Sequence, residues 1–344
     1  MGSLDGPTVS IAPSSEVPLS NVTPRPAPLN RDRRDLLKLM NLGGVVFAYS
    51  LLRSLVGCSS DAKDGQAAAG PRSGTARGAA DDFFFLQLSD PHWGFSGPAV
   101  NPEADQELPS TVATINASAA QPDFIIFTGD LTHNTDDVDV RRMRMLEFQK
   151  ITSGLQAPLR FMPGEHDAAA DAGAVYQEIF GQTHYSFDHK GIHFVALDNV
   201  SDPHAMLGAD QLHWLGSDLA PLDAQAPIVV FAHRPLWDLK PEWDWATPDA
   251  AQAIEILTPY ENVTVFFGHI HQELHHTTGH IQHHSARSLA FALPTPETPG
   301  MRTPIPWDPN HPRAGLGYRS VEATPVSQEY KLTELPIQTG DGAP

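Results

Sequence analysis

Residues 83–92 read FFFLQLSDPH, an apolar run that passes directly into an acidic residue, Asp90, and a histidine, His92. The run 83–88 is short, rich in aromatic residues and bounded by polar ones, which predicts a buried strand. Asp90 and His92 would then lie just past its carboxyl end. Active sites of open α/β sheets form at that edge, so this stretch indicates both a fold class and a place for function.

Similar apolar runs recur along the chain, separated by segments of helical periodicity. We expect further strands at 124–127, 159–162, 228–232 and 263–267, and helices at 107–120, 137–154, 171–181, 210–219 and 248–257. A hairpin is expected at 184–197, short added strands at 272–277, 281–285 and 287–292, and a closing strand within 318–332. Strands that alternate with helices predict one α/β domain.

Carboxylates and imidazoles follow five of these strands. They are Asp90, His92, Asp130, Glu165, His166, Asp167, His233, His269 and His271, and glycines at 129, 164 and 268 precede three of them. Glycine allows the close approach that a sharp turn beside a metal requires. Carboxylates and imidazoles bind first-row metals, and two metals that share a carboxylate form the usual clamp for in-line attack at phosphorus. Each of these motifs alone is weak evidence for a metal site, but five motifs in order, one after each of five strands, are a specific signal.

The ordered set resembles the calcineurin-like metallophosphoesterase superfamily over roughly residues 83–292. The motifs that carry the resemblance are Asp90-x-His92, Gly129-Asp130, Gly164-Glu165-His166-Asp167, His233 and Gly268-His269-x-His271. The resemblance implies a four-layer α/β/β/α sandwich with two mixed sheets. It also implies a dinuclear-metal-dependent hydrolase of phosphate esters, a phosphodiesterase or phosphomonoesterase that uses a metal-activated hydroxide. A narrower likeness, to bacterial cyclic-nucleotide phosphodiesterases, rests on Asp-x-His and Gly-Asp-Leu-Thr.

The same resemblance implies a role for each site residue. Asp90, His92 and His271 would hold the first metal, Asp130 would bridge, and Glu165, His233 and His269 would hold the second. His166, as imidazolium, would stabilise the transition state or protonate the leaving group, and Asp167 would orient it. The two ions would be divalent or trivalent, with Mn, Fe and Zn all left open.

Glu165 departs from the family pattern, which has Asn at this position. Glu supplies a charged oxygen and reaches one methylene further than Asn, so it could still bind the second metal. The added charge should tighten metal binding and reduce the Lewis acidity that activates water. We therefore expect metal binding to survive and activity to be altered. The alternative is a non-catalytic or weakly active metal-binding envelope protein on the same fold.

Other polar residues near the motifs carry weaker signals. His133 and Asn134 are candidates for substrate contact, although a solvated loop is an equal alternative, and Arg234 could bind phosphate or pair with a surface carboxylate. Five histidines between positions 275 and 284 favour a polar hairpin face over an extra metal site. Trp237, Trp243 and Trp245 could wall a substrate pocket or simply pack together.

The formal net charge of −19 argues against binding to a nucleic-acid duplex, because the chain offers no net positive field to attract phosphates. We expect a small phosphate ester as the partner molecule. With a single cysteine, Cys58, no internal disulfide can form. The sequence leaves the oligomeric state open.

The N-terminal segment resembles an export signal of the twin-arginine type. Arg33-Arg34 precedes the apolar run 39–57, which Arg53 interrupts, and Leu55-Val56-Gly57-Cys58 resembles a lipobox in which Cys58 would be lipidated. We expect a signal at 1–58, a flexible linker at 59–80, the metallophosphoesterase domain at 81–322 and a tail at 323–344. The protein would then be in the periplasm or cell envelope, contacting the membrane only through its signal or lipid. The alternative to an export signal is an amphipathic N-terminal helix, and the alternative to lipidation is a signal removed elsewhere or an uncleaved anchor in which Cys58 is incidental.

Overall fold

The computed structural model describes residues 82–243, 245–298, 300, 302–324 and 329–338. The expected signal with Cys58 and the expected linker 59–80 lie outside these residues. Among the described residues, none of the helices combines the length and the apolar character that crossing a membrane needs.

Alternate residues of the first strand, β1 (Phe83–Leu88), face two different layers, as the twofold period of a strand requires. Phe83 and Phe85 point toward the second sheet, whereas Leu86 and Leu88 point toward helices. β1 is the middle strand of a five-stranded sheet in the order β11-β10-β1-β2-β3. The other strands are β2 (Phe124–Thr128), β3 (Leu159–Met162), β10 (Tyr318–Thr324) and β11 (Glu329–Leu335). β1, β2 and β3 are parallel, and β10 and β11 close the sheet in antiparallel fashion.

A six-stranded sheet, in the order β4-β5-β6-β7-β9-β8, forms the second half of the fold. Its strands are β4 (Tyr185–His189), β5 (Ile192–Ala196), β6 (Pro227–Phe231), β7 (Asn262–Phe267), β8 (Leu274–Thr278) and β9 (Ile281–Ser285). β5, β6, β7 and β9 run parallel, while β4 and β8 are antiparallel at the two edges. Both sheets are therefore mixed.

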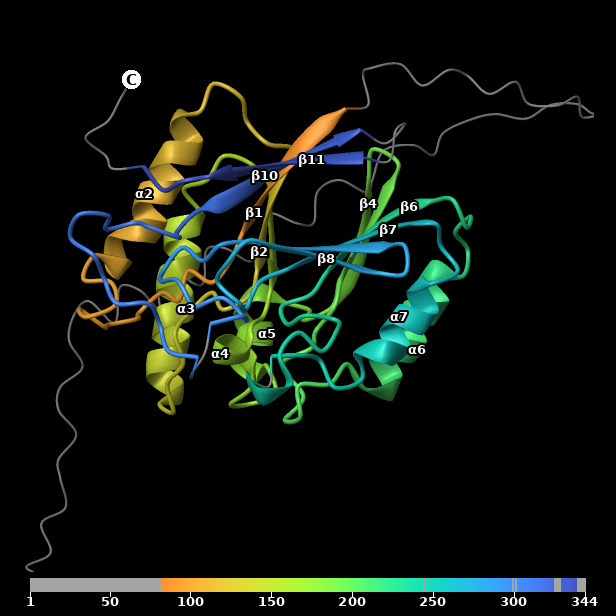
Figure 1. The fold of residues 1–344 in the computed structure, drawn as a ribbon, viewed down its shortest axis with the longest axis horizontal. Coiled ribbons are helices and arrows are strands. Elements are labelled where there is room, and N and C mark those ends of the chain that lie inside the picture. The colour runs from red at the N-terminus through yellow and green to blue at the C-terminus, as the bar shows by residue number, and fades with distance from the viewer. Residues whose placement is uncertain (1–81, 244, 299, 301, 325–328, 339–344) are drawn as a thin grey trace, which may run out of the picture. The chain divides into compact units, whose positions relative to one another are not determined.

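The two sheets pack face to face through a core rich in phenylalanine, and helices cover their outer faces (Figure 1). Against the first sheet lie α2 (Ala104–Ala117), α3 (Val138–Thr152) and α5 (Ala174–Phe180). The short α4 (Glu165–Ala168) follows the end of β3. Against the second lie α6 (Gly208–Leu219) and α7 (Ala250–Leu257). The expected four-layer α/β/β/α sandwich is confirmed.

Polar side chains link the two sheets. Gln87, on the inward face of β1, donates to the carbonyl oxygen of Phe267 at 3.1 Å. Arg319 of β10 is fully buried, donates to the carbonyl oxygen of Ser285 at 2.6 Å and pairs with Glu334 of β11. These contacts fix the first sheet relative to the ends of β7 and β9.

Three details differ from the sequence-based expectation. The domain does not end at residue 322, because β10 continues to Thr324 and β11, within the expected tail, pairs with it along its whole length. Residues 287–292 do not form a strand but an irregular segment. The short helix α4 was not expected, since four residues are too few to show helical periodicity.

Arg319→Met should lower the free energy of unfolding by about 3–5 kcal/mol, because it leaves the largely buried Glu334 carboxylate without its partner. Urea or thermal unfolding of the variant measures the loss.

Lys331→Met is the matched control, since Lys331 and Glu322 form a second directly opposed pair on the same two strands, with both side chains exposed. Its loss should stay below about 1 kcal/mol. Equal losses in the two variants would contradict the role given to Arg319.

Candidate active site

The loops after β1 and β2 run side by side beyond the ends of their strands. The backbone N–H of Asp90 donates to the carbonyl oxygen of Gly129 at 3.1 Å, and that of His92 donates to the carbonyl oxygen of Asp130 at 2.9 Å. Parallel pairing thus continues for several residues past the sheet. It brings Asp90 and His92 next to Asp130, as expected from the positions of these residues after two neighbouring strands.

Five of the seven candidate metal ligands have a positive φ angle. They are Asp90, His92, Asp130, His269 and His271, with φ between 42° and 66°. Non-glycine residues rarely adopt this left-handed conformation, and strain of this kind concentrates at functional sites. The surrounding hydrogen bonds hold these residues in a backbone geometry that each would otherwise avoid, and that geometry turns their side chains inward.

All three of the expected glycines leave room for candidate ligands, and a Cβ atom on Gly129 would lie 2.3 Å from His233 Nδ1. A Cβ atom on Gly164 would lie 2.1 Å from the Asp130 carboxylate, and one on Gly268 would lie 2.8 Å from the Asp90 carboxylate. A larger residue at Gly164 or Gly268 would therefore crowd a candidate carboxylate, and one at Gly129 would crowd a candidate imidazole.

Asp90, His92, Asp130 and His271 form one group in which the candidate ligand atoms lie within 4.8 Å of one another. His271 Nε2 is 3.3 Å from Asp90 Oδ1 and 3.1 Å from His92 Nε2. All four side chains are buried. The set matches the first metal site and the bridging residue expected from the sequence.

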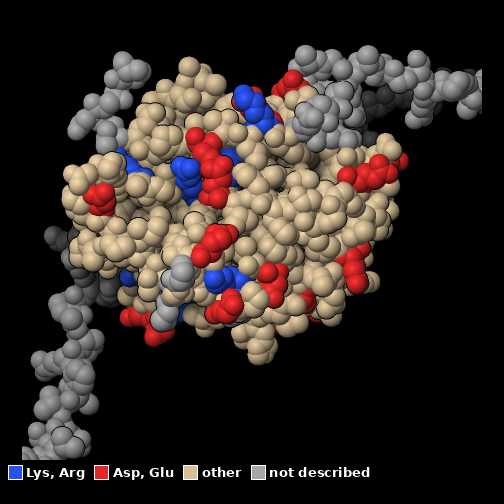
Figure 2. Space-filling view, viewed as in Figure 1, with Lys and Arg blue, Asp and Glu red and all other residues tan. Residues whose placement is uncertain are grey.

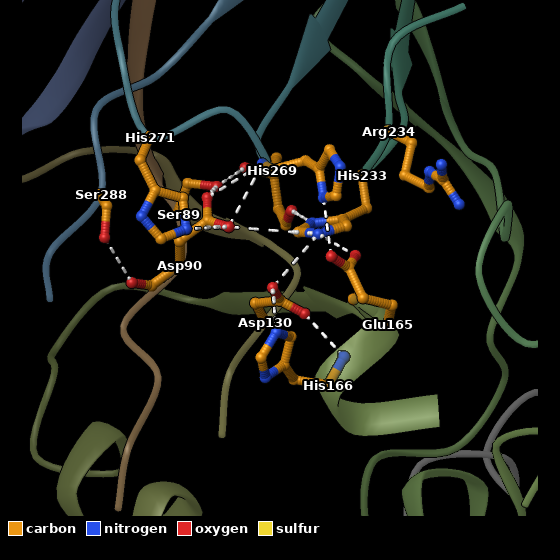
Figure 3. Close-up of polar contacts among 12 residues, drawn as sticks. Ser89, Asp90, Asp130, Glu165, His166, His233, Arg234, His269, His271 and Ser288 are labelled. Atoms are coloured by element: carbon orange, nitrogen blue, oxygen red, sulfur yellow. Dashed lines mark hydrogen bonds and ion pairs between the residues drawn. The ribbon is translucent and has the colours of Figure 1, made fainter. Parts of the chain in front are cut away.

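Glu165, His233 and His269 form a second group, also with ligand atoms within 4.8 Å (Figure 3). The two oxygens of Glu165 lie 2.8 Å from His233 Nε2 and 2.8 Å from His269 Nδ1. Glu165, at the start of α4, therefore reaches both histidines at the ends of β6 and β7, and its longer side chain spans the distance.

Asp130 stands between the two groups. Its Oδ2 atom is 3.5 Å from His92 Nε2 in the first group and 3.5 Å from His233 Nε2 in the second. One carboxylate oxygen can thus face both sites at once, which is the position of a bridging ligand.

Backbone carbonyls set the tautomers of two histidines. His233 Nδ1 is 2.7 Å from the carbonyl oxygen of Thr128, and His271 Nδ1 is 2.7 Å from that of Phe291. Because a carbonyl only accepts, each Nδ1 carries the proton and each Nε2 is left as the ligand atom. Outer contacts of this kind accompany histidine ligands in metal sites.

The charges of the site favour ionised carboxylates. Burial opposes ionisation of Glu165, but His269 and His233 outweigh it and hold the pKa of this carboxyl well below its usual value. Burial likewise opposes ionisation of Asp90, but His271 and His233 outweigh it and keep the pKa of this carboxyl below its ordinary value. Burial, with the nearby His166 and His271, lowers the pKa of His92 far enough to keep its ring neutral. Ionised carboxylates and neutral imidazoles are the forms that bind metal.

The second group has unsatisfied polar atoms that fit a cation. Within the described part of the chain, Glu165 Oε2, His233 Nε2 and both ring nitrogens of His269 are buried without an aligned hydrogen-bond partner. Buried polar atoms are almost always paired. One such atom from each of the three converging side chains, with a single nitrogen from His269, fits a metal ion that they would coordinate.

His166 lies where expected, but its orienting partner is not Asp167. His166 Nε2 is 3.9 Å from Asp130 Oδ2, and its Nδ1 accepts from the backbone N–H of Asn134 at 3.2 Å. Asp167 instead accepts from the backbone N–H groups of Leu131, Thr132 and Gly164 at 2.8–3.0 Å. Burial and the nearby Asp130 carboxylate raise the pKa of Asp167 to about 7, although the hydrogen bonds from these backbone donors lower it. Asp167 therefore ties the turn before α4 to the loop after β2.

The candidate substrate residues occupy different surroundings. His133 Nδ1 lies 3.4 Å from His92 Nδ1, directly beside the site, and burial with His166 and Arg144 lowers its pKa to about 4. Asn134 contributes its backbone N–H to His166. Arg234 is buried, donates to the carbonyl oxygen of Trp245 and points away from Asp90 and Asp130 (Figure 3).

Two supporting residues were missed in the sequence. Asn199, shortly after β5, accepts from the backbone N–H of His233 at 3.2 Å and donates to the carbonyl oxygen of Arg234 at 2.9 Å. Ser288 donates to the carbonyl oxygen of Asp90 at 2.8 Å. Asn199 follows a strand as the candidate ligands do, so a search for polar residues just past the strand ends could have found it. Ser288 gave no such signal, because it lies within an apolar run.

The histidines of the β8–β9 hairpin lie apart from this centre. His276 stacks on Trp237 with ring centroids 4.4 Å apart, and His283 is fully buried beside the same tryptophan. The described residues of the hairpin form no group of three converging ligand atoms. The hairpin is therefore not simply a polar face, since part of its histidine set packs as core.

Comparisons with known proteins agree with this geometry. The sequence profile of the family described as calcineurin-like phosphoesterase matches residues 85–273, more than half of the chain. A protein of Rhodopseudomonas palustris named as a probable cyclic nucleotide phosphodiesterase is 26% identical over 224 residues, covering 61% of this chain and 79% of that protein. A cAMP/cGMP dual specificity phosphodiesterase of Mycobacterium tuberculosis is 28% identical over 164 residues, which cover 45% of this chain and about half, 51%, of that protein.

Among solved structures, a purple acid phosphatase from yellow lupin (Lupinus luteus) matches with a TM-score of 0.51 and 13% identity, over 70% of this chain and 49% of that one. This likeness concerns the fold alone. The family profile and the buried groups of metal-binding residues together carry the assignment: the chain belongs to the calcineurin-like phosphoesterase family and is a dinuclear-metal-dependent hydrolase of phosphate esters.

Proposed function

We propose that the protein is a phosphodiesterase that hydrolyses 3′,5′-cyclic nucleotides or chemically similar small phosphodiesters. The observation that carries the proposal is the position of Asp130 Oδ2, 3.5 Å from an imidazole nitrogen of each candidate metal group. The printed names of the two bacterial relatives support the substrate class.

The candidate ligands divide into two sets, as the distances suggest. Asp90, His92, Asp130 and His271 would hold one ion, and Asp130, Glu165, His233 and His269 the other. When bound, two such cations supply Lewis acidity at the phosphoryl oxygens and lower the pKa of water. Burial of the ligands excludes bulk water from the site. Despite this burial, Asp130 and Glu165 raise the pKa of His233 well above its ordinary value, so this ring would release a proton when it binds metal.

His166 is the candidate catalytic side chain outside the ligand sets. Because Asn134 donates to its Nδ1, the neutral ring carries its proton on Nε2, the atom that faces Asp130. His166 would donate this hydrogen bond to a phosphoryl or leaving-group oxygen. This role differs from the imidazolium that the sequence suggested.

A small substrate suits the surface better than a nucleic-acid duplex. On the face drawn in Figure 2, the described basic side chains lie next to acidic ones and form no broad basic patch. The formal charge of −19 adds to this argument.

Export remains a separate proposal that rests on the sequence of residues 33–58. The twin arginines and the apolar run support a periplasmic or envelope location, and Cys58 supports a lipid anchor there.

The substrate proposal predicts that Mn²⁺-loaded full-length protein hydrolyses bis(p-nitrophenyl) phosphate and 3′,5′-cyclic AMP faster than p-nitrophenyl phosphate. Release of p-nitrophenol and chromatography of the nucleotide product measure the rates. A metal-loaded protein that is silent on all three and on a nucleotide panel would favour the non-catalytic alternative.

His166→Ala serves as the control for this assay. It should bind as much metal as the parent and turn over at least about 100-fold more slowly, the size expected for loss of a group that assists proton transfer. An unchanged rate would mean that the observed hydrolysis does not use this site.

Glu165→Asn should keep the protein folded and still able to bind two ions, but with a weaker second site, since a neutral oxygen replaces a charged one between His233 and His269. Calorimetric titration of the metal-free protein with Mn²⁺ resolves the two affinities. Loss of both ions would refute the view that Glu165 tunes an otherwise normal site.

A further inference from the structure

Two arginines of α3 hold the loop that follows β2. Arg144 Nη1 donates to the carbonyl oxygens of His133 at 2.7 Å and Asn134 at 3.0 Å. Arg141, three residues earlier on the same face of the helix, donates to the carbonyl oxygen of Thr135 at 2.9 Å and pairs with Asp171. Three consecutive carbonyls therefore point at α3 rather than at the site.

The loop held in this way touches two histidines of the site through their outer nitrogens. His133 Nδ1 lies 3.4 Å from His92 Nδ1, and the Asn134 N–H donates to His166 Nδ1 at 3.2 Å. The other nitrogen of each ring faces the centre, since His92 Nε2 and His166 Nε2 lie 3.5 and 3.9 Å from Asp130 Oδ2. The loop thus contacts each ring through Nδ1, the nitrogen that faces away from the centre of the site.

The two rings need opposite tautomers, and one dipeptide supplies both. A backbone N–H can only donate, so His166 Nδ1 must be an acceptor and the ring proton lies on Nε2. His92 must leave Nε2 free as a ligand, so its proton lies on Nδ1 and is donated to His133 Nδ1. A displaced loop would release both constraints together.

Arg144 also contacts the loop after β1. A Cβ atom on Gly94, two residues after His92, would lie 2.5 Å from Arg144 Nε. The Arg144 side chain is therefore packed against the loop after β1 while its guanidinium group is hydrogen-bonded to the loop after β2.

We propose that Arg144 is a positioning residue that, by holding the His133–Asn134 loop, fixes the tautomers of His92 and His166. The effect on turnover rests on the proposed function, whereas the effect on metal affinity does not. The hydrogen bonds of Arg144 go to backbone carbonyls and to none of the candidate ligand atoms.

Arg144→Gln should weaken Mn²⁺ binding and lower kcat, each by about 10–100-fold, the range typical of losing outer contacts to a metal site. KM should change less than kcat, since the substitution removes hydrogen bonds to backbone carbonyls and leaves the side chains of His133 and Asn134 in place. Arg144→Lys should recover most of the metal affinity and most of kcat, because a single ammonium group can donate to the two carbonyl oxygens as Nη1 does. The measurements are calorimetric titration of the metal-free full chain with Mn²⁺ and steady-state hydrolysis of bis(p-nitrophenyl) phosphate.

Arg142→Gln is the matched control, with the same charge change on the same helix. Arg142 pairs with the exposed Glu178, so this variant should keep the parent's metal affinity and kcat. Equal losses in both variants would show general damage to α3 and overturn the proposal, as would parent-like values in Arg144→Gln.

His133→Phe tests the same contact if the Arg144→Gln variant does not fold. Phenylalanine can still pack on Phe95, whose ring centroid is 5.1 Å from that of His133, but offers no acceptor to His92. Mn²⁺ affinity should again fall by about 10-fold or more, and an unchanged affinity would overturn the proposal. If the parent hydrolyses no phosphodiester while the Mn²⁺ affinities still differ, the proposed function fails and the role of Arg144 stands.

Discussion

The contact on which the rest of the site depends is the one that Asp130 makes with both groups of histidines. Its Oδ2 atom lies 3.5 Å from His92 Nε2 and 3.5 Å from His233 Nε2. His92 comes from the first sheet and His233 from the second, so one carboxylate joins the two halves of the sandwich. The polar links made by Gln87 and Arg319 hold the same sheets together beside it.

The loops that bring these side chains together have an unfavourable conformation of their own. Five candidate ligands have a positive φ angle, a cost of order 1–3 kcal/mol per strained residue. Hydrogen bonds around the loops offset this conformational cost. They are the backbone pairing beyond β1 and β2, the bonds that Asp167 accepts from three backbone N–H groups, and the bonds of Asn199 and Ser288. The site is therefore a stabilised arrangement of the fold, and the outer contacts determine its geometry as much as the ligands do.

The sequence predicted the parts that depend on strand position and residue type. The strands at 83–88 and 159–162 were predicted with their observed ends, and the seven candidate ligands converge as expected. Contacts made through backbone atoms could not be predicted, because any residue can make them. The Asn134 N–H that meets His166, and the carbonyls that Arg144 binds, are of this kind. Residues 287–292 were misassigned because an apolar run that walls a site resembles a strand.

The central claim is that two cations share Asp130, and anomalous diffraction from crystals grown with Mn²⁺ tests it most directly. The account predicts two anomalous peaks roughly 3.5–4 Å apart, one within reach of His92 and His271 and the other of His233 and His269, with the Asp130 carboxylate touching both. A single peak, or two peaks that do not share Asp130, would contradict it.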